Sequence, residues 1–210
     1  MAPSANVSNA ATEFIFSRTF DAPREDVWSA FTRPEHLKHW WGTPGSSLEI
    51  VRHELRPGGL FHYRMKFPDG RAMWARFIFR EIVAPERLVW LNGFSDEHGG
   101  LTRNPWVPGL PLETLNTVTL AARDGKTLLT ITAVPFNASS EEVQLFAGGI
   151  NGMKMGFGAT FKILANYLMS AKGYGCPRGS VRGPLAPANR DREGAVLSLH
   201  SASLSRRGSK

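Results

Sequence analysis

The chain has 210 residues, of which 42% are hydrophobic, including 13 Phe and 6 Trp, so it can bury one substantial core. Its net charge of +7 comes mostly from residues 172–210, which carry eight Lys or Arg and two Asp or Glu, a net of +6. The remaining +1 belongs to residues 1–171. Such a nearly neutral domain has no basic footprint for nucleic acid, and we expect no nucleic-acid partner.

The sequence also predicts the cellular compartment of the protein and the boundaries of its domain. No window reaches the roughly 18 consecutive apolar residues of a transmembrane helix, and the opening MAPSANVSNAA has neither the basic start nor the apolar run of a secretory signal. One cysteine, Cys176, permits no disulfide within the chain. We therefore expect a cytoplasmic protein with no membrane span. We expect residues 1–11 to be flexible, 12–171 to form one domain, and the Gly-, Pro-, Ser- and Arg-rich 172–210 to be a disordered basic tail.

The first elements are a strand and two short helices. Residues Glu13–Phe20 alternate between apolar and polar side chains, which predicts a strand. A helix follows, with Pro23 in its first turn. Pro34 ends this helix and begins a short second one over residues 35–38.

From Ser47 onward the periodicity changes to that of strands. Short connections such as Arg123-Asp124-Gly125 are typical of hairpins, so the strands should form one antiparallel meander. The one long connection, Asp96–Pro111, has the length of a lid or binding loop. The predicted strands are Leu48–Leu55, Leu60–Phe67, Ala72–Val83, Arg87–Phe94, Leu112–Ala122 and Thr127–Val134.

A long amphipathic helix closes the domain, over about Ser139–Ser170. Ser139 and Glu142 have the spacing of a capping box. Apolar residues then recur at steps of three and four, which places them on one face. They are Val143, Phe146, Ile150, Met153, Phe157, Phe161, Leu164 and Leu168.

The helix also contains glycines on the face opposite its apolar stripe, at Gly148, Gly152 and Gly156. Each costs about 1 kcal/mol relative to alanine in a helix. Two explanations are open: another element, best Asp96–Pro111, packs on this bare backbone, or the glycines soften the helix so that it moves when a ligand enters. The apolar stripe itself should face the concave side of a curved sheet.

Five collinear motifs resemble a known family. They are FSRTFDAPREDVWSAFTRPEHLKHWWG, RPGGLFHYRMKFPDG, REIVAPERLVWLN, TVTL with GKTLLT, and GMKMGFGATFKILANYL. Residues 12–170 thereby resemble the SRPBCC, or START-like, helix-grip superfamily, and within it the branch of heat-shock ATPase activator homologues (AHSA). The resemblance implies an α+β helix-grip fold: a curved antiparallel β-sheet of about seven strands wrapped around a long C-terminal helix, with two short helices after strand one.

The resemblance leaves function open among three classes. Members of the superfamily include lipid and sterol carriers, hormone receptors and polyketide cyclases. The first expectation is a small-molecule binding protein whose partner is a small hydrophobic ligand, aromatic or lipid-like. The alternatives are a cyclase- or hydrolase-like enzyme on a hydrophobic substrate, and an interaction protein that contacts a heat-shock chaperone. We name no catalytic residue and expect no cofactor; the oligomeric state stays open, with a dimer among the options.

A curved sheet around a helix leaves a space whose walls the sequence identifies. Aromatic and methionine walls suit an apolar ligand. The alternative is that these side chains simply fill the core. The expected lining residues are Trp40, Trp41, Phe61, Tyr63, Met65, Phe77, Phe79, Trp90, Asn116, Met153, Phe157 and Phe161.

Few polar groups in the sequence suggest chemistry. Tyr63, Asn116 and Asn92 could point inward and orient a ligand carbonyl or polarise it. His36 and His39 have a spacing that could ligate zinc, but nothing nearby completes four ligands. We expect no metal site and solvent-facing histidines, including His53 and His62.

Overall fold

The computed structural model describes residues 12–172. The expected flexible segment 1–11, and all of the expected tail beyond residue 172, lie outside the described residues. The elements, in order, are β1 (Phe14–Phe20), α1 (Arg24–Thr32), α2 (Pro34–Leu37), β2 (Ser47–His53), β3 (Leu60–Lys66), β4 (Ala72–Val83), β5 (Arg87–Ser95), β6 (Leu101–Thr102), β7 (Glu113–Arg123), β8 (Lys126–Phe136) and α3 (Ser140–Lys172).

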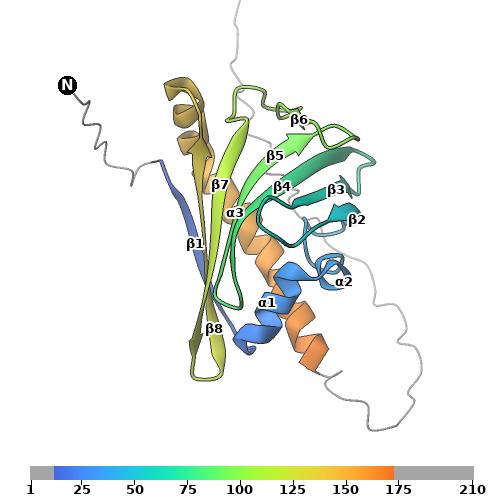
Figure 1. The fold of residues 1–210 in the computed structure, drawn as a ribbon, viewed down its shortest axis with the longest axis vertical. Helices are drawn as coiled ribbons and strands as arrows, with labels where there is room; N and C mark the ends of the chain where they lie inside the picture. Colours follow the sequence, from blue (N-terminus) through green and yellow to red (C-terminus); the bar gives the residue numbers. More distant parts are fainter. Residues whose placement is uncertain (1–11, 173–210) are drawn as a thin grey trace, which may run out of the picture.

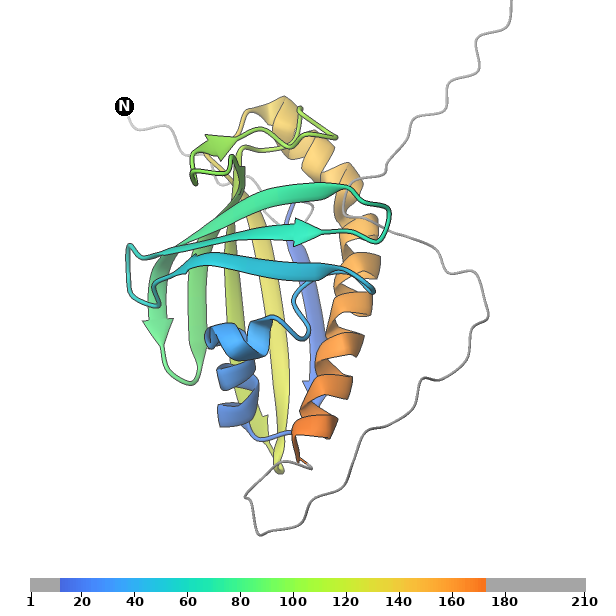
Figure 2. The ribbon, with the colours of Figure 1, turned by 90° about the vertical axis from the view of Figure 1, so that its right-hand side faces the viewer.

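One curved antiparallel sheet carries the domain, in the order β1-β8-β7-β5-β4-β3-β2, with the short β6 paired to β5. The turn between β7 and β8 has Asp124 and Gly125 at φ 49° and 72°, the left-handed backbone of a two-residue hairpin. The long helix α3 and the two short helices lie on the concave side of the sheet (Figures 1 and 2). The predicted α+β fold with a long terminal helix is confirmed.

The capping box of α3 forms as its sequence predicts. The backbone N–H of Glu142 donates to the Ser139 hydroxyl at 3.3 Å, and the N–H of Ser139 donates to the Glu142 carboxylate at 2.8 Å. Arg103, from the loop after β6, also pairs with Glu142. The hydrogen bond from Arg103 is the largest cause that holds the pKa of the Glu142 carboxyl below its usual range, and the backbone N–H of Ser139 acts in the same direction. The long loop is therefore tied to the first turn of α3.

The apolar stripe of α3 packs most closely near the C-terminal half of the helix. Phe161 is fully buried, with its ring 5.6 Å from that of Phe16 and 5.9 Å from that of Phe20, both on β1. Phe157 meets Phe14 of the same strand at 5.0 Å. The helix thus closes one end of the sheet against β1 and leaves the opposite end of the concave face to other segments.

The glycine face of α3 is not covered by the loop Asp96–Pro111, which was the first of the two explanations for its glycines. Among the described residues, nothing lies within 4 Å of a Cβ built on Gly148 or Gly152, whereas Gly156 is buried. The loop that was expected to cover this face instead reaches the helix near Leu145, 3.1 Å from a Cβ built on Gly109 (Figure 2). Packing of Asp96–Pro111 on Gly148 and Gly152 was thus a wrong expectation, because Arg103 draws the loop to the first turn of the helix.

Replacement of Gly152 by alanine should stabilise the protein by up to about 1 kcal/mol, because the added methyl meets open space and the helix loses a flexible residue. Chemical denaturation of the variant and the parent measures the difference. Gly125→Ala is the control of opposite sign, since φ at Gly125 is 72° and a side chain there is strained. A loss of stability in Gly152→Ala would show that another element occupies this face.

Candidate ligand-binding cavity

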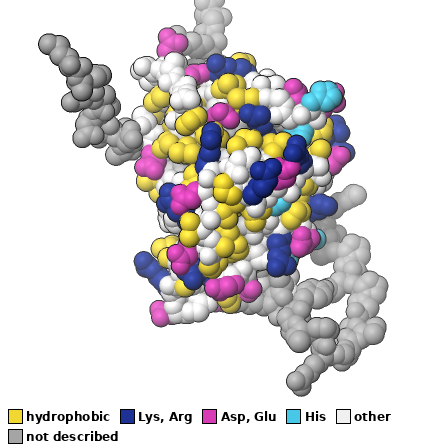
Figure 3. All heavy atoms as spheres, in the orientation of Figure 1, with side chains coloured by type: hydrophobic (Ala, Val, Ile, Leu, Met, Phe, Trp, Pro, Cys, Tyr) yellow, Lys and Arg dark blue, Asp and Glu magenta, His cyan; other side chains and the backbone are white. Residues whose placement is uncertain are grey.

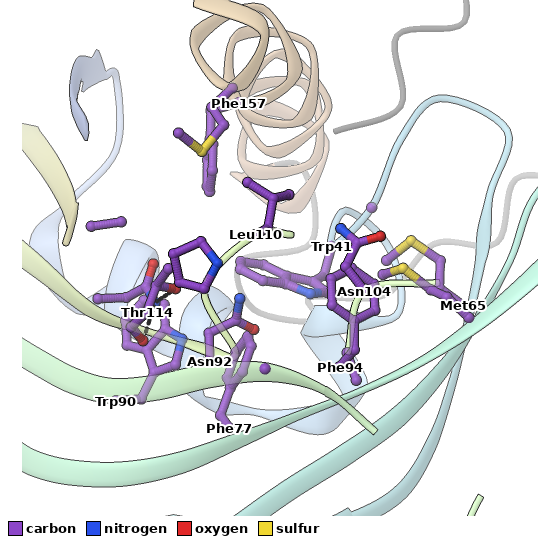
Figure 4. Close-up of a pocket in the computed structure, with 18 of the residues that line it drawn as sticks. Trp41, Met65, Phe77, Trp90, Asn92, Phe94, Asn104, Leu110, Thr114 and Phe157 are labelled. Carbon is purple, nitrogen blue, oxygen red and sulfur yellow. Dashed lines mark hydrogen bonds between the residues drawn. The ribbon is translucent and has the colours of Figure 1, made fainter. Parts of the chain in front are cut away.

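A cavity of about 220 Å³ lies between the concave face of the sheet and the stretch of α3 from Phe146 to Thr160. One water molecule needs only about 10–15 Å³ of such space, so the cavity has room for a small organic molecule. Its floor comes from β3, β4, β5 and β7, and α3 contributes Phe146, Met153 and Phe157. Figure 4 shows Phe157 and Leu110 on the helix side and Phe77 and Trp90 on the sheet side of this space.

The curvature of the sheet produces the cavity. Phe161 and Phe157 hold α3 against β1. The short helices α1 and α2 cover the part of the concave face that carries Phe61 and Phe79. Between these two packed regions the helix and the sheet diverge, and the loop that carries Leu110 and Pro111 bridges the gap. The cavity therefore lies where α3 and the sheet are too far apart for their side chains to fill the space between them.

Eight of the twelve residues expected to line a ligand site lie on the wall of this cavity. They come from the loop after α2, from β3, β4, β5 and β7, and from α3, so residues far apart in the sequence converge here. These eight are Trp41, Tyr63, Met65, Phe77, Trp90, Asn116, Met153 and Phe157.

The other four, Trp40, Phe61, Phe79 and Phe161, do not reach it. Trp40 turns toward α1, where its indole N–H donates to the Ala30 carbonyl at 2.9 Å. Its ring lies 4.6 Å from Phe31 and 6.2 Å from Phe161. Trp40 and Phe161 therefore fill the core between α1 and α3, and their expected place in the cavity is corrected.

Phe61 and Phe79 lie further along β3 and β4, beneath the two short helices. Together with Leu37 of α2 and His53 they surround a second space of only about 10 Å³. Their rings stand 5.1 Å and 6.0 Å from the His53 imidazole. The short helices fill this part of the concave face, so the expectation that α3 leaves a hollow over Phe61 and Phe79 is also corrected.

Tyr63 is the one titratable side chain on the cavity wall among the described residues. Burial raises the pKa of its phenol to about 12, although a side-chain hydrogen bond with Trp41 acts in the opposite direction. The phenol is therefore neutral at physiological pH. No Asp, Glu, Lys, Arg or His lines the cavity within the described part of the chain. Lys154, next to the lining residue Met153 on α3, is exposed on the helix surface.

Three carboxamides interrupt the apolar wall: Asn92 on β5, Asn116 on β7 and Asn104 in the long loop (Figure 4). The amide nitrogen of Asn116 donates to the backbone carbonyl and the hydroxyl of Thr114, at 3.0 Å and 2.9 Å. The amide oxygen of Asn104 accepts hydrogen bonds from the backbone N–H groups of Trp106 and Val107, at 2.8 Å and 2.9 Å. Hydrogen bonds within the protein thus orient two of the three amides.

Asn104 was not among the residues that sequence reasoning selected. The Asn104-Pro105 dipeptide is a turn signal, and the loop itself has the length of a binding loop. Neither observation predicts that this asparagine is 4% exposed on a cavity wall. Its position depends on the pairing of β6 with β5 and on the contact of the loop with α3.

The histidines form no metal centre among the described residues, where no group of three His, Cys, Asp or Glu side chains converges. His36 shares a hydrogen bond of 2.5 Å with the Tyr167 hydroxyl, and His39 stacks on the same ring. His62 departs from the expectation of solvent exposure. It is 3% exposed, stacked on Trp74 and bonded to the Asp96 carbonyl.

Charged side chains of both signs are spread over the surface of the domain (Figure 3). Figure 3 shows Lys and Arg interspersed with Asp and Glu on one face of the molecule, as the nearly neutral charge of residues 1–171 implies. None of the helices in the described part of the chain combines the length and hydropathy of a membrane span.

Comparison with protein-family models identifies the chain. Residues 21–169 match the model described as "Activator of Hsp90 ATPase homolog 1-like protein". The chain belongs to this family. The resemblance in the five sequence motifs is thereby confirmed, and the AHSA-like domain spans nearly all of the described residues. A comparison with curated proteins gave no match.

Solved structures from several bacteria share the fold. A protein from Arthrobacter aurescens is 30% identical, over 80% of this chain and 91% of its own, with a TM-score of 0.65. A protein from Mycobacterium smegmatis is 26% identical, over 80% of this chain and 96% of its own, with a TM-score of 0.61. A Nitrosomonas europaea protein is also 26% identical, over 79% and 99% of the two chains, with a TM-score of 0.61.

Proposed function

We propose that this AHSA-like protein binds a small apolar molecule in the cavity beneath α3. The observation that supports the proposal is the cavity itself: about 220 Å³, walled mainly by aromatic and methionine side chains, with a few carboxamides among them. Sites for small molecules are commonly concave and apolar with a small number of placed polar groups. Aromatic rings from three strands (β3, β4 and β5) and from α3 offer broad contact to a flat or flexible ligand.

A cyclase- or hydrolase-like enzyme is the weaker candidate. Amide groups such as those of Asn92 and Asn104 can polarise a carbonyl, but proton transfer needs a group that changes its protonation near the working pH. Tyr63, with a pKa of about 12, is the one titratable group on the described wall. The lining therefore favours binding over acid–base chemistry.

Interaction with a heat-shock chaperone is the third candidate, suggested by the family description. Such contact uses the outer surface, so it predicts capture of the chaperone that persists when the cavity is filled. Binding of a small molecule predicts the reverse dependence. The two candidates are thus separated by one set of variants.

The cavity-filling variant Ala133→Leu provides the test. Ala133 lies on β8, is 5% exposed and lines the cavity, so a larger side chain there occupies the ligand's space. The full chain is screened by native mass spectrometry and thermal shift against neutral lipids, sterols and aromatic polyketides. We expect the parent to bind members of the panel and Ala133→Leu to bind them at least about tenfold more weakly, a difference of about 1.4 kcal/mol.

Ala121→Leu is the matched control, since Ala121 lies exposed on β7 and away from the cavity. It should bind as the parent does. Failure of the parent to bind any compound, or equal binding by Ala133→Leu, would contradict the proposal.

A further inference from the structure

Asn92 brings an amide without a hydrogen-bond partner to the floor of the cavity. It lies on β5 in alternation with Trp90 and Phe94, and all three side chains line the cavity. The carboxamide makes no hydrogen bond with any described residue, yet both its oxygen and its nitrogen keep exposed surface. Figure 4 shows this side chain extending from the sheet into the space below Leu110, beside the ring of Trp41. A ligand in the cavity can therefore reach the amide.

The neighbours of Asn92 across the sheet explain why its amide has no partner. Phe77 of β4 is paired with it on one side, and Thr114 of β7 is paired with it on the other. A phenyl ring has no strong acceptor or donor, and the Thr114 hydroxyl already accepts a hydrogen bond of 2.9 Å from the amide of Asn116. That hydroxyl still has its own hydrogen to donate, and no side chain or carbonyl of the described residues accepts it.

Asn92 and Thr114 together form a polar pair on an otherwise largely apolar floor. Side chains at directly paired positions of antiparallel strands have Cβ atoms about 4.5–5.5 Å apart, so one small polar group can contact both. The Asn92 amide donates through its nitrogen and accepts through its oxygen, whereas the Thr114 hydroxyl has a hydrogen to donate. A hydroxyl or a carboxamide on a ligand complements this polar pair, because each of these groups both accepts and donates.

Ligands at the two extremes of polarity fit this floor poorly. A hydrocarbon seals the Asn92 amide from water without giving it a hydrogen bond, which reduces affinity. A carboxylate, phosphate or ammonium group is buried without a counter-charge, since no described lining residue is Lys, Arg, His, Asp or Glu. Burial of an unpaired charge is far more costly than burial of a neutral polar group. The wall therefore favours a neutral ligand with a hydrogen-bonding group.

Building on the proposed function, we infer that Asn92 and Thr114 determine the specificity of the cavity. Its ligand is an uncharged, largely apolar molecule with a hydroxyl or carboxamide group that hydrogen-bonds to this polar pair. The apolar part of the ligand packs against Phe77, Met153 and Phe157, which line the same space. Alcohols, phenols and primary amides with an aromatic or aliphatic body have this chemistry.

Matched compounds that differ in one group test the inference by equilibrium dialysis against the full chain at pH 7.5. One comparison sets 2-naphthol against 2-methylnaphthalene, and 4-hydroxybiphenyl against 4-methylbiphenyl, so that a methyl group replaces the hydroxyl. Because water hydrates a hydroxyl better than a methyl group, this hydroxyl-to-methyl affinity ratio is judged by its change in variants. The other comparison sets 2-naphthamide against the charged 2-naphthoate. We expect the amide to bind at least about tenfold more tightly than the carboxylate.

Two variants assign the preference to the polar pair. Asn92→Leu replaces the amide by an apolar side chain of similar shape, and Thr114→Val does the same for the hydroxyl. Asn92→Leu should lower the hydroxyl-to-methyl ratio at least about tenfold, because the hydroxyl compound loses a hydrogen bond and the methyl compound no longer seals an amide. Thr114→Val should lower this ratio about fivefold, the equivalent of one net hydrogen bond.

Each variant has a control of the same chemistry outside the cavity. Asn166→Leu changes an exposed asparagine near the C-terminal end of α3. Thr117→Val changes a threonine on β7 that does not line the cavity. Both controls should keep the hydroxyl-to-methyl ratio of the parent. Circular dichroism checks that every variant folds, and if Asn92→Leu does not fold, the ratio in Thr114→Val still decides.

The outcomes separate this inference from the proposed function. A hydroxyl-to-methyl ratio that stays unchanged in the folded variants of Asn92 and Thr114 would overturn the inference and leave an apolar binding site intact. Binding of 2-naphthoate as tight as that of 2-naphthamide would overturn the requirement for a neutral ligand. Binding only of lipids, sterols or polyketides that lack both a hydroxyl and an amide would also overturn it. Absence of binding by every probe and by that whole panel would contradict both proposals.

Discussion

Replacing Phe161 by alanine should lower the free energy of unfolding by about 3–5 kcal/mol, the range for a fully buried phenylalanine. Phe161 is 0% exposed and joins α3 to the sheet and to the short helices. Its ring lies within 6.2 Å of those of Phe31 and Trp40, and within 5.9 Å of those on β1. Neighbours from three elements cannot collapse together into the vacated space. The part of the destabilisation that comes from the cavity left behind should therefore be large.

Urea denaturation of the full chain measures this loss. A lower midpoint with an unchanged slope would show lost stability without a change in the surface exposed on unfolding. Met155→Ala is the control on the same helix, because Met155 is 58% exposed and should change stability by less than about 0.5 kcal/mol. If the two variants were equally stable, α3 would not depend on this packing for its position.

Gly59→Ala should destabilise the protein by more than about 2 kcal/mol, for a steric reason. A Cβ built on Gly59 lies 2.1 Å from the Glu54 carbonyl oxygen and 2.8 Å from that of Arg56, and backbone atoms cannot move aside cheaply. The Gly59 carbonyl also accepts the N–H of Phe79 at 3.0 Å, so a shift of the turn breaks its link to β4. Each broken hydrogen bond adds about 1 kcal/mol.

The adjacent Gly58 is the matched comparison for Gly59. Its φ is 74°, and nothing among the described residues lies within 4 Å of its Cβ. Gly58→Ala should therefore cost only the left-handed backbone penalty, about 1–2 kcal/mol. Thermal and urea unfolding of the two variants show which substitution lowers the stability more. A larger loss for Gly58→Ala than for Gly59→Ala would show that the turn accommodates the crowded methyl group.

Local patterns predicted most of the fold. Alternation of side chains located the long strands, and the Asp124-Gly125 turn and the Ser139–Glu142 capping box occur as their sequences predict. The two-residue β6 escaped prediction because Leu101–Thr102 is too short to show a period. Both faces of β5 are buried, Leu88 and Trp90 on one side and Val89 and Leu91 on the other, so its sequence has no alternation of apolar and polar residues to show which face lies inside.

The site was harder to predict, because an aromatic residue on an inward face can fill a core or line a cavity. Phe77 and Phe79 follow the same alternation on β4, yet Phe77 lines the large cavity and Phe79 lies under the short helices. The difference depends on where α1 and α2 end. Asn104 is the opposite case, a loop asparagine that the pairing of β6 and the Arg103–Glu142 contact bring to the cavity wall.

The sequence by itself determined the family, the order of the elements, the antiparallel sheet and the amphipathic helix, because periodicity, turn residues and caps act between neighbours along the chain. Only the tertiary structure decided which part of the concave face is filled and which is hollow. It also decided that Asn104, from the long loop, joins a cavity wall on which the described residues carry no charged side chain. These features depend on contacts between segments far apart in the chain, which no local pattern encodes.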